Sequence, residues 1–193
     1  VVFAGNTANN TGGAVFVTGK SSLDNFKNCN FINNTAEDGG AIYFLEVNCD
    51  LIEDAISINN GKNTIYVVSG ENITAVSSWF GNNATDYNIK PEAGNVTMDN
   101  WLFLNATADA DVISAFNSSN IVFKLYLYNE SSANISEYDN SILMPVNLTI
   151  TSTNGYVDNA VVNLGDSIRY TATGVGEGSV TATIENVECT IGL

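Results

Sequence analysis

The chain has 193 residues, a formal net charge of −15 and no histidine. Acidic residues outnumber basic ones 21 to 6, so the basic footprint that nucleic-acid binding requires is missing. Without histidine, chemistry that needs an imidazole base or zinc ligand is excluded. The sequence contains no apolar run near the ~18 residues of a membrane span, no signal peptide and no lipidation motif. Apolar residues make up 45%, enough to bury a core, which argues against disorder.

The first part of the chain contains an internal repeat. The segment Phe3–Ala8, followed by Gly12–Phe16, returns as Phe31–Ala36, followed by Gly39–Phe44. The two copies differ by one residue of spacer. A repeat of this kind predicts a solenoid in which each unit buries its apolar side against the next.

A second alignment places Asn28–Phe31 on Asn48–Leu51, an offset of 20 residues. A period near 20 predicts coils of three short strands and three turns, stacked at roughly 4.8 Å in a parallel β-helix. We therefore expect residues 1–98 to form the terminal coils of a right-handed parallel β-helix.

Individual residues of the repeat have expected roles. Phe31, Leu51 and Phe80 should stack in one interior column. The Gly-Gly pairs supply positive φ at a tight corner. Asn33 and Asn34 tolerate the left-handed region and can hydrogen-bond the local backbone there.

From about residue 99 the repeats stop and strands of near-alternating apolar residues appear. Turn chemistry separates them at Asn154–Gly155, at Gly165–Asp166 and in the glycine-rich segment 174–178. Seven strands without a helical period predict an antiparallel Ig-like β-sandwich over residues 99–193. The Ig disulfide is missing, because Cys189 is the only cysteine of this half. The expected strands are Trp101–Thr107, Asn120–Tyr128, Met144–Thr153, Tyr156–Leu164, Ser167–Thr173, Ser179–Glu185 and Val187–Ile191.

The repeat motifs resemble a known family. A Gly-Gly-Ala-aliphatic motif (Gly12–Val15, Gly39–Ile42) accompanies an Asn-rich Phe-x-x-Asn motif (Phe3–Asn6, Phe31–Asn34), as in the repeats of chlamydial polymorphic outer-membrane proteins. The third copy departs from the motif, because Gly61–Thr64 reads Gly-Lys-Asn-Thr. The corner assignment of that copy therefore stays open.

A closer resemblance is to the adhesin-like surface proteins of methanogenic archaea. Their coils often end in an aromatic-Gly-Asn segment, matched here by Trp79–Asn82, and a Trp-led strand and an Ig-like module follow, matched by Asn100–Leu104. The stretch Tyr170–Thr183 is similar to bacterial Ig-like modules of surface proteins. The resemblance implies an extracellular, cell-surface protein without catalytic activity or cofactor. Its partners would be glycans or proteins of a host or partner cell.

Two alternative functions remain. Several β-helix proteins are polysaccharide lyases or hydrolases, which use a Lys or Arg base beside calcium-binding carboxylates, or two carboxylates across a cleft. The best carboxylate pairs, Glu37 with Asp38 and Glu53 with Asp54, are neighbours on an extended chain and point to opposite faces. We therefore expect no enzymatic activity. The other alternative is a structural subunit that associates through its open coils into a filament.

Asp109 and Asp111 form an Asp-x-Asp motif within reach of Asp99. Such acids can bind calcium, but this motif lacks a Gly-centred loop. Solvated loop charges are the favoured interpretation, and no metal is expected.

Ten Asn-x-Ser/Thr sequons occur, and three of them lie in expected exposed loops. In a secreted protein we expect glycosylation at one or more of Asn117, Asn129 and Asn134.

Cys29 and Cys49 would occupy equivalent places in adjacent coils. Their Cα atoms would then be ~4.8 Å apart, within the range that a disulfide accepts. A stacked pair of buried thiols is the alternative. Cys189 is expected to be a small core residue.

Overall fold

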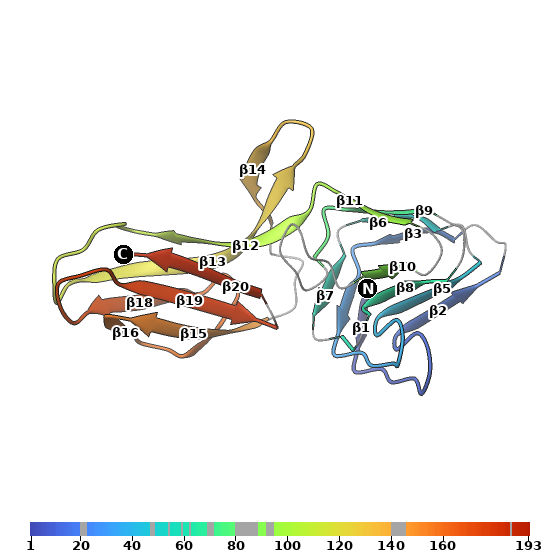
Figure 1. Cartoon of the computed structure of the whole chain (residues 1–193), viewed down its shortest axis with the longest axis horizontal. Coiled ribbons are helices and arrows are strands. Elements are labelled where there is room, and N and C mark those ends of the chain that lie inside the picture. The colour runs from blue at the N-terminus through green and yellow to red at the C-terminus, as the bar shows by residue number, and fades with distance from the viewer. Residues whose placement is uncertain are drawn as a thin grey trace. The chain divides into compact units, whose positions relative to one another are not determined.

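The computed structural model describes residues 1–19, 23–46, 49–53, 55–58, 60–61, 63–68, 72–79, 89–91, 95–139, 146–185 and 187–193. Within these residues the chain is all-β, with twenty strands and no helix, and so no helix able to cross a membrane. Contacts divide the chain into two units (Figure 1). The first contains Val1–Phe103 and Leu127–Ser136, and the second contains Leu104–Tyr126 and Glu137–Leu193.

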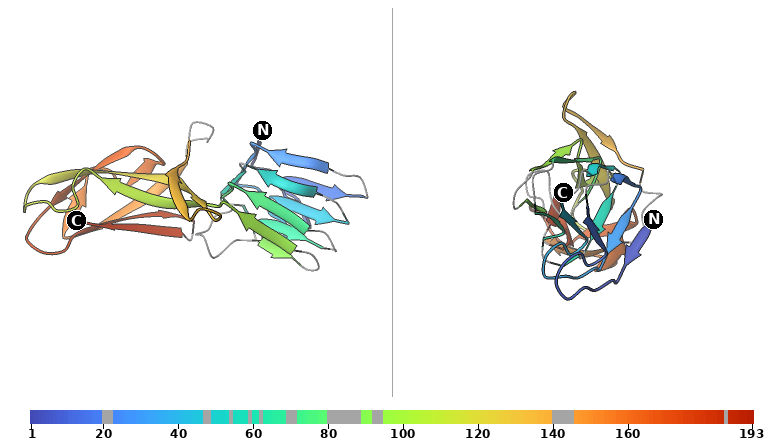
Figure 2. Two further views of the ribbon diagram at one scale, coloured as in Figure 1. Left: turned by 90° about the horizontal axis from the view of Figure 1, so that it is seen from above. Right: turned by 90° about the vertical axis from the view of Figure 1, so that its right-hand side faces the viewer.

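Strands of the first unit visit three parallel sheets in turn, so that β1, β2 and β3 are followed by β4, β5 and β6 in the same order. Figure 2 shows these strands stacked one upon another. One sheet contains β1 (Val2–Ala4), β4 (Asn30–Ile32) and β7 (Ile56–Ile58). The second contains β2 (Val15–Thr18), β5 (Ile42–Leu45), β8 (Ile65–Val67) and β10 (Ile89–Pro91). The third contains β3 (Leu23–Lys27), β6 (Cys49–Glu53), β9 (Asn72–Val76) and β11 (Asn95–Asp99).

The strand register corrects the expected period. Phe3 pairs with Phe31, and Phe31 pairs with Ser57, so these turns of the chain take 28 and 26 residues. The shortest turns take 23 residues, for example from Ile42 to Ile65. The period near 20 is wrong because Asn30 and Phe31 lie in β4, whereas Cys49 and Leu51 lie in β6, a strand of another sheet.

The interior of the first unit is an apolar cluster that includes Phe31, Phe44, Ile52 and Ile73, each at most 1% exposed. Inside it the Phe3 and Phe31 rings stack at 5.0 Å and 4°. The expected burial of Phe31 is confirmed, but the column with Leu51 is wrong. Leu51 lies in β6, where it pairs with Asn25 and Thr74, whereas Phe31 lies in β4. Phe80 lies outside the described residues.

The remaining strands form two further sheets. One has the order β12 (Leu102–Ala108), β13 (Ser118–Asn129), β18 (Ser167–Ala172) and β16 (Gly155–Val157), with β14 (Asn134–Glu137) also paired to β13. The other has the order β17 (Val161–Asn163), β15 (Asn147–Thr153), β19 (Ser179–Ile184) and β20 (Val187–Gly192). The pairings β13–β18, β16–β18, β15–β17, β15–β19 and β19–β20 are antiparallel. Buried side chains of both sheets, such as Phe123, Leu148, Tyr170 and Val180, form the core of the second unit.

Most expected strands of this half are found within a few residues of their predicted bounds, but Tyr156–Leu164 is not one strand. It forms β16 and β17, which belong to different sheets. The break follows Val157, where the Asp158 side chain accepts a hydrogen bond from the Arg169 backbone N–H at 3.0 Å. The chain thereby leaves one sheet and enters the other. Strand β14 was not anticipated, since all four of its residues are exposed and carry no alternating pattern.

Candidate functional site

An asparagine ladder connects successive turns of the first unit. Asn34 is fully buried, and its Oδ1 accepts hydrogen bonds from the backbone N–H and the side-chain amide of Asn6 at 3.0 and 2.9 Å. The Oδ1 of Asn60 accepts the corresponding pair from Asn34, both at 2.9 Å. The side-chain amides of Asn34 and Asn60 also donate to the preceding turn, to the carbonyls of Phe3 and Phe31 respectively. The last residue of the Phe-x-x-Asn motif therefore cross-links the turns instead of capping its own corner.

The neighbouring residue, Asn33, has a φ of 55°, which confirms the expected left-handed conformation. Gly12 and Gly39 have φ values of 65° and 64°, so the expected positive φ at the Gly-Gly corners is also confirmed. The second glycine of each pair is needed for close approach. A Cβ on Gly40 would lie 2.5 Å from the carbonyl oxygen of Gly61 in the next turn. Gly61 thus packs at this corner although the third copy of the motif is degraded.

Three aromatic rings stack on the outer side of the sheet that contains β2, β5 and β8. Tyr43 stacks on Phe16 and on Tyr66, each at 5.3 Å and within 10° of parallel. Ile42 and Phe44, the neighbours of Tyr43, are buried on the inner side. Phe16 is 46% exposed, and exposure decreases along the stack to 6% at Tyr66. We refer to Phe16, Tyr43 and Tyr66 as the outer ring stack.

The outer ring stack was not singled out from the sequence, although a signal for it exists. Each copy of the repeat contains an aromatic residue between two aliphatic or aromatic residues that point inward: Val15-Phe16-Val17, Ile42-Tyr43-Phe44 and Ile65-Tyr66-Val67. In a strand the central residue of such a triplet faces the opposite side. An outward aromatic at the same position of three repeats predicts a stack.

The acidic residues considered for catalysis have other contacts. Glu53 forms an ion pair with Lys27 at 2.8 Å across adjacent turns. Asp38 accepts a hydrogen bond from the side-chain amide of Asn63 at 2.9 Å, and Glu37 is exposed. Asp54 lies outside the described residues. The described members of these pairs therefore do not face each other across a cleft.

The Asp-x-Asp motif is also not assembled into a ligand cluster within the described residues. Asp109 accepts a hydrogen bond from the side-chain amide of Asn120 at 2.8 Å, and Asp111 is exposed. Solvated or singly hydrogen-bonded carboxylates of this kind do not form the multidentate oxygen cage that calcium prefers.

The two cysteines of the first unit are not at equivalent positions. Cys49 pairs with Leu23 in the register of β3 and β6, whereas Cys29 follows β3. The expectation of equivalent places is therefore wrong, because it used the same mistaken offset as the period. Cys29 is a free, buried thiol that contacts the carbonyl of Lys27 at 3.4 Å, and burial raises its pKa. Cys189 is free and half-buried in β20.

The sequon residues lie at the surface to different degrees. Asn117 and Asn134 are exposed. Asn129 is half-buried, and its Oδ1 accepts hydrogen bonds from the backbone N–H and the hydroxyl of Ser132. Asn117 and Asn134 are therefore the more accessible acceptors.

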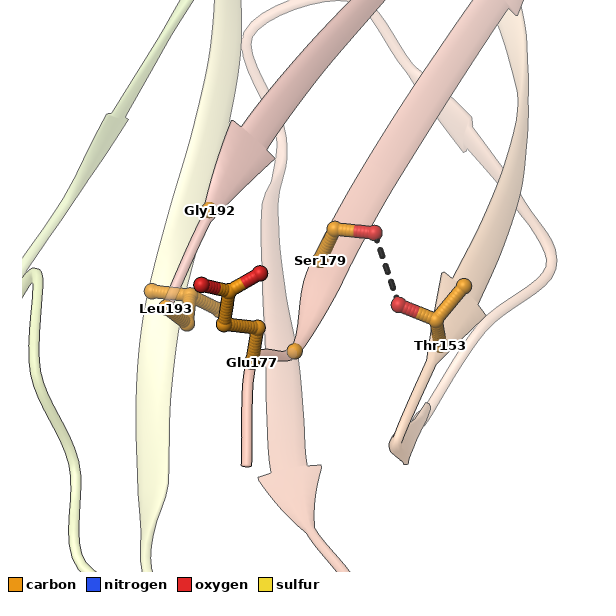
Figure 3. Close-up of a pocket in the computed structure, with 6 residues that line it drawn as sticks. Thr153, Glu177, Ser179, Gly192 and Leu193 are labelled. Carbon is orange, nitrogen blue, oxygen red and sulfur yellow. Dashed lines mark hydrogen bonds between the residues drawn. The ribbon is translucent and has the colours of Figure 1, made fainter. Parts of the chain in front are cut away.

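A hollow of about 350 Å³ lies where β15 and β20 end and β19 begins. Figure 3 shows the hydrogen-bonded Thr153 and Ser179 hydroxyls, 2.8 Å apart, on one side, with Glu177 and Leu193 on the other. Among the described residues that line it, Glu177 is the one with a titratable side chain.

Residues 1–18 and 28–45 match the Chlamydia polymorphic membrane protein repeat. These two segments include the Phe-x-x-Asn and Gly-Gly-Ala motifs, the stacked Phe3 and Phe31, and the first two rings of the outer ring stack. The match suggests a repeat protein of the outer-membrane type. No curated protein and no solved structure matches the chain.

Proposed function

We propose that this chain is an adhesin-like protein of the cell surface, which attaches by contact and catalyses no reaction. In this proposal the first unit consists of coils of a right-handed parallel β-helix, and the second is an Ig-like β-sandwich. Three parallel sheets visited in turn support the former, and two sheets with antiparallel pairing support the latter. The repeat match over residues 1–18 and 28–45 supports display at the surface.

The observation behind the attachment role is the outer ring stack. Aromatic residues are enriched at protein interfaces because they combine a large apolar surface with few side-chain conformations. Phe16, which is 46% exposed, and the half-buried Tyr43 lie on paired strands of a parallel sheet, which limits the entropy lost on binding. The partner in this proposal is a protein or glycan on a host or partner cell.

A cell-binding assay with the purified chain tests this role. Tyr43→Ala removes the central ring, and we expect it to reduce binding by about tenfold, the effect of losing one interface anchor. Val161→Ala is the matched control, because Val161 is an exposed apolar residue outside the repeats. Equal binding by the Tyr43→Ala variant and the unaltered chain would overturn the proposal, provided that both retain the same circular dichroism spectrum.

Several further features belong to the same proposal. Resemblance to adhesin-like proteins of methanogenic archaea supports an extracellular location and an archaeal source. Glycosylation at the exposed Asn117 and Asn134 fits such a location. Mass spectrometry of the protein from its native cells tests both sites.

The alternative to the adhesin-like function is a carbohydrate-active enzyme. It would need a base or a pair of carboxylates in a cleft. Incubation with pectins, alginates and host-type glycans should release neither new reducing ends nor unsaturated products. Turnover that is lost on mutation of Glu37, Asp38, Glu53 or Asp54 would replace the adhesin proposal with the enzyme.

Self-association is a second candidate function, and it would involve the coil edge formed by β1, β2 and β3. The Oδ1 of Asn6 receives no hydrogen bond from a described residue, whereas Asn34 and Asn60 each accept two at this position. Phe16 is the ring of the outer ring stack at the same edge. Another coil of the same kind would extend both the asparagine ladder and the outer ring stack by one residue. Sedimentation velocity of the unaltered chain and the Phe16→Asp variant tests this candidate, which predicts assemblies that the substitution dissociates.

A further inference from the structure

A second aromatic feature lies on the outer face of the sheet that contains β13, β18 and β16. It is a shallow hollow of about 430 Å³, within the range of roughly 300–1,000 Å³ of small-molecule sites. Its polar residues are aligned by the strand register, since Thr171 of β18 lies opposite both Ser118 of β13 and Tyr156 of β16. Its lining consists of Phe116, Ser118, Tyr156, Asp158, Arg169 and Thr171.

The polar floor of the hollow is held in place by hydrogen bonds. Along β18, Ile168, Tyr170 and Ala172 are buried, so Arg169 and Thr171 face outward. Asp158 lies beside Arg169, because the Asp158 N–H donates to the Arg169 carbonyl at 3.1 Å and its Oδ1 accepts from the Arg169 N–H at 3.0 Å. The hydroxyls of Ser118 and Thr171 are 2.9 Å apart. The floor therefore combines one carboxylate, one guanidinium and two hydroxyls.

Two exposed aromatic rings flank this floor. Phe116 is 76% exposed and Tyr156 is 57% exposed, although aromatic residues of this size are usually largely buried. Phe116 also has a φ of 67°, a conformation that a bulky residue rarely adopts. Its N–H donates to the carbonyl of Ala172 at 3.1 Å, which fixes the turn. The fold thus holds the Phe116 ring in solvent at a cost in backbone strain.

From this arrangement we propose that the hollow between Phe116 and Tyr156 binds a neutral saccharide. Exposed aromatic faces can pack on the apolar C–H faces of a pyranose ring, while carboxylate, guanidinium and hydroxyl groups hydrogen-bond its hydroxyls. A neutral ligand fits the charges. Asp158 and Arg169 compensate each other locally, and the net charge of −15 repels anionic glycans. The inference goes beyond the attachment role of the outer ring stack and can hold if that role fails, because it uses none of the same residues.

The test uses residues 1–193 produced in a host that adds no N-glycans, so that Asn117 carries no sugar beside the hollow. The chain is first applied to an array of neutral oligosaccharides and their sialylated and uronic-acid counterparts. We expect binding to neutral members. The strongest neutral oligosaccharide is then titrated by calorimetry, at concentrations up to about 1 mM, the weak end of specific binding.

Variants locate the site. Tyr156→Ala and Arg169→Gln should each weaken binding about tenfold or more, as loss of an anchor does. Tyr156→Phe keeps the ring and should stay within about threefold of the unaltered chain, and Val161→Ala should not change the affinity. Tyr156, Val161 and Arg169 are exposed, so these variants should retain the fold, and circular dichroism checks this.

Three results would overturn the inference. The first is the absence of binding to any neutral member. The second is preference for acidic glycans that Arg169→Gln removes, which would assign the hollow to an anionic ligand. The third is neutral binding that survives Tyr156→Ala and Arg169→Gln together, which would place the ligand elsewhere. In that third case, if Tyr43→Ala abolishes binding to the array, the saccharide binds at the outer ring stack.

Discussion

The Oδ1 of Asn34 accepts two hydrogen bonds from a single residue of the preceding turn, the backbone N–H and the side-chain amide of Asn6. Asn34 in turn donates from its own N–H and amide to Asn60. A buried amide with this many partners satisfies polar groups of three turns at once. Its contribution lies mainly in the donors and acceptors that would be orphaned without it.

Replacing Asn34 with Ala should therefore destabilise the first unit by about 3 kcal/mol, since an unsatisfied buried polar group costs about 1–3 kcal/mol and several would be created. Urea unfolding followed by tryptophan fluorescence measures this loss, because Trp79 and Trp101 both lie in the first unit. Asn33→Gly is the control. Asn33 is exposed with a φ of 55°, which glycine adopts freely, so a change within about 1 kcal/mol is expected. A similar loss of unfolding free energy for both variants would show that the hydrogen bonds of Asn34 do not contribute specifically to stability.

The close contact of the glycine corners gives a second prediction. Gly40→Ala places a Cβ 2.5 Å from the carbonyl oxygen of Gly61. Backbone atoms on both sides cannot rotate away, so the turns must separate, at a cost of about 3 kcal/mol. Gly192→Ala is the control, because a Cβ there meets no atom within 4 Å. It should change stability by less than about 0.5 kcal/mol. Thermal unfolding of the two variants decides the matter, and equal melting temperatures would contradict the close packing of the corner.

Inner and outer phenylalanines should respond differently to truncation. Phe31 is fully buried and stacks on Phe3 at 5.0 Å, so Phe31→Ala should cost about 3–5 kcal/mol. Phe16 is 46% exposed, and Phe16→Ala should cost less than about 1.5 kcal/mol. Urea unfolding of both variants measures the difference. A loss below about 1 kcal/mol for Phe31→Ala would mean that its side chain is solvated.

The sequence and the structure agree where the signal is local. The Phe-x-x-Asn and Gly-Gly-Ala motifs led to the positive φ at Gly39 and Asn33 and to the burial of Phe31, because these properties depend on a few adjacent residues. The asparagine ladder was not predicted because the motif is incomplete at its third member. The residue three positions before Asn60 is Ser57 and not a phenylalanine.

Features that depend on contacts between distant parts of the sequence were harder to predict. The length of a turn depends on which strands pair, and the similarity of the two Asn-Cys segments aligned Phe31 of β4 with Leu51 of β6, a strand of another sheet. The hollow on the second unit depends on the alignment of Ser118, Thr171 and Tyr156 across three strands. These residues are distant in sequence and share no local motif, so only the register brings them together.

Removal of divalent cations should leave stability unchanged. The core of the first unit consists of apolar side chains and stacked strands, and the described residues contain no group of three or more metal-ligating side chains. Incubation with a chelator should therefore shift the melting temperature by less than about 2 °C, whereas loss of a structural ion would cost more than about 1 kcal/mol and shift it further. A large drop would point to calcium at Asp109 and Asp111, and mutation of both to Asn should then abolish the effect.

The strained ring of Phe116 allows a prediction that separates function from stability. Phe116→Asn removes the exposed ring and places at a φ of 67° a residue that tolerates the left-handed region. Since a left-handed conformation costs an ordinary residue about 1–2 kcal/mol, and only the exposed ring is lost, stability should stay the same or rise by up to about 1 kcal/mol. Affinity for the neutral oligosaccharide should nevertheless fall about tenfold. Calorimetric titration and thermal unfolding of the same preparation give both quantities. A variant that binds as well as the unaltered chain would show that the ring is not part of the site, and one that loses stability together with affinity would show that Phe116 supports the turn.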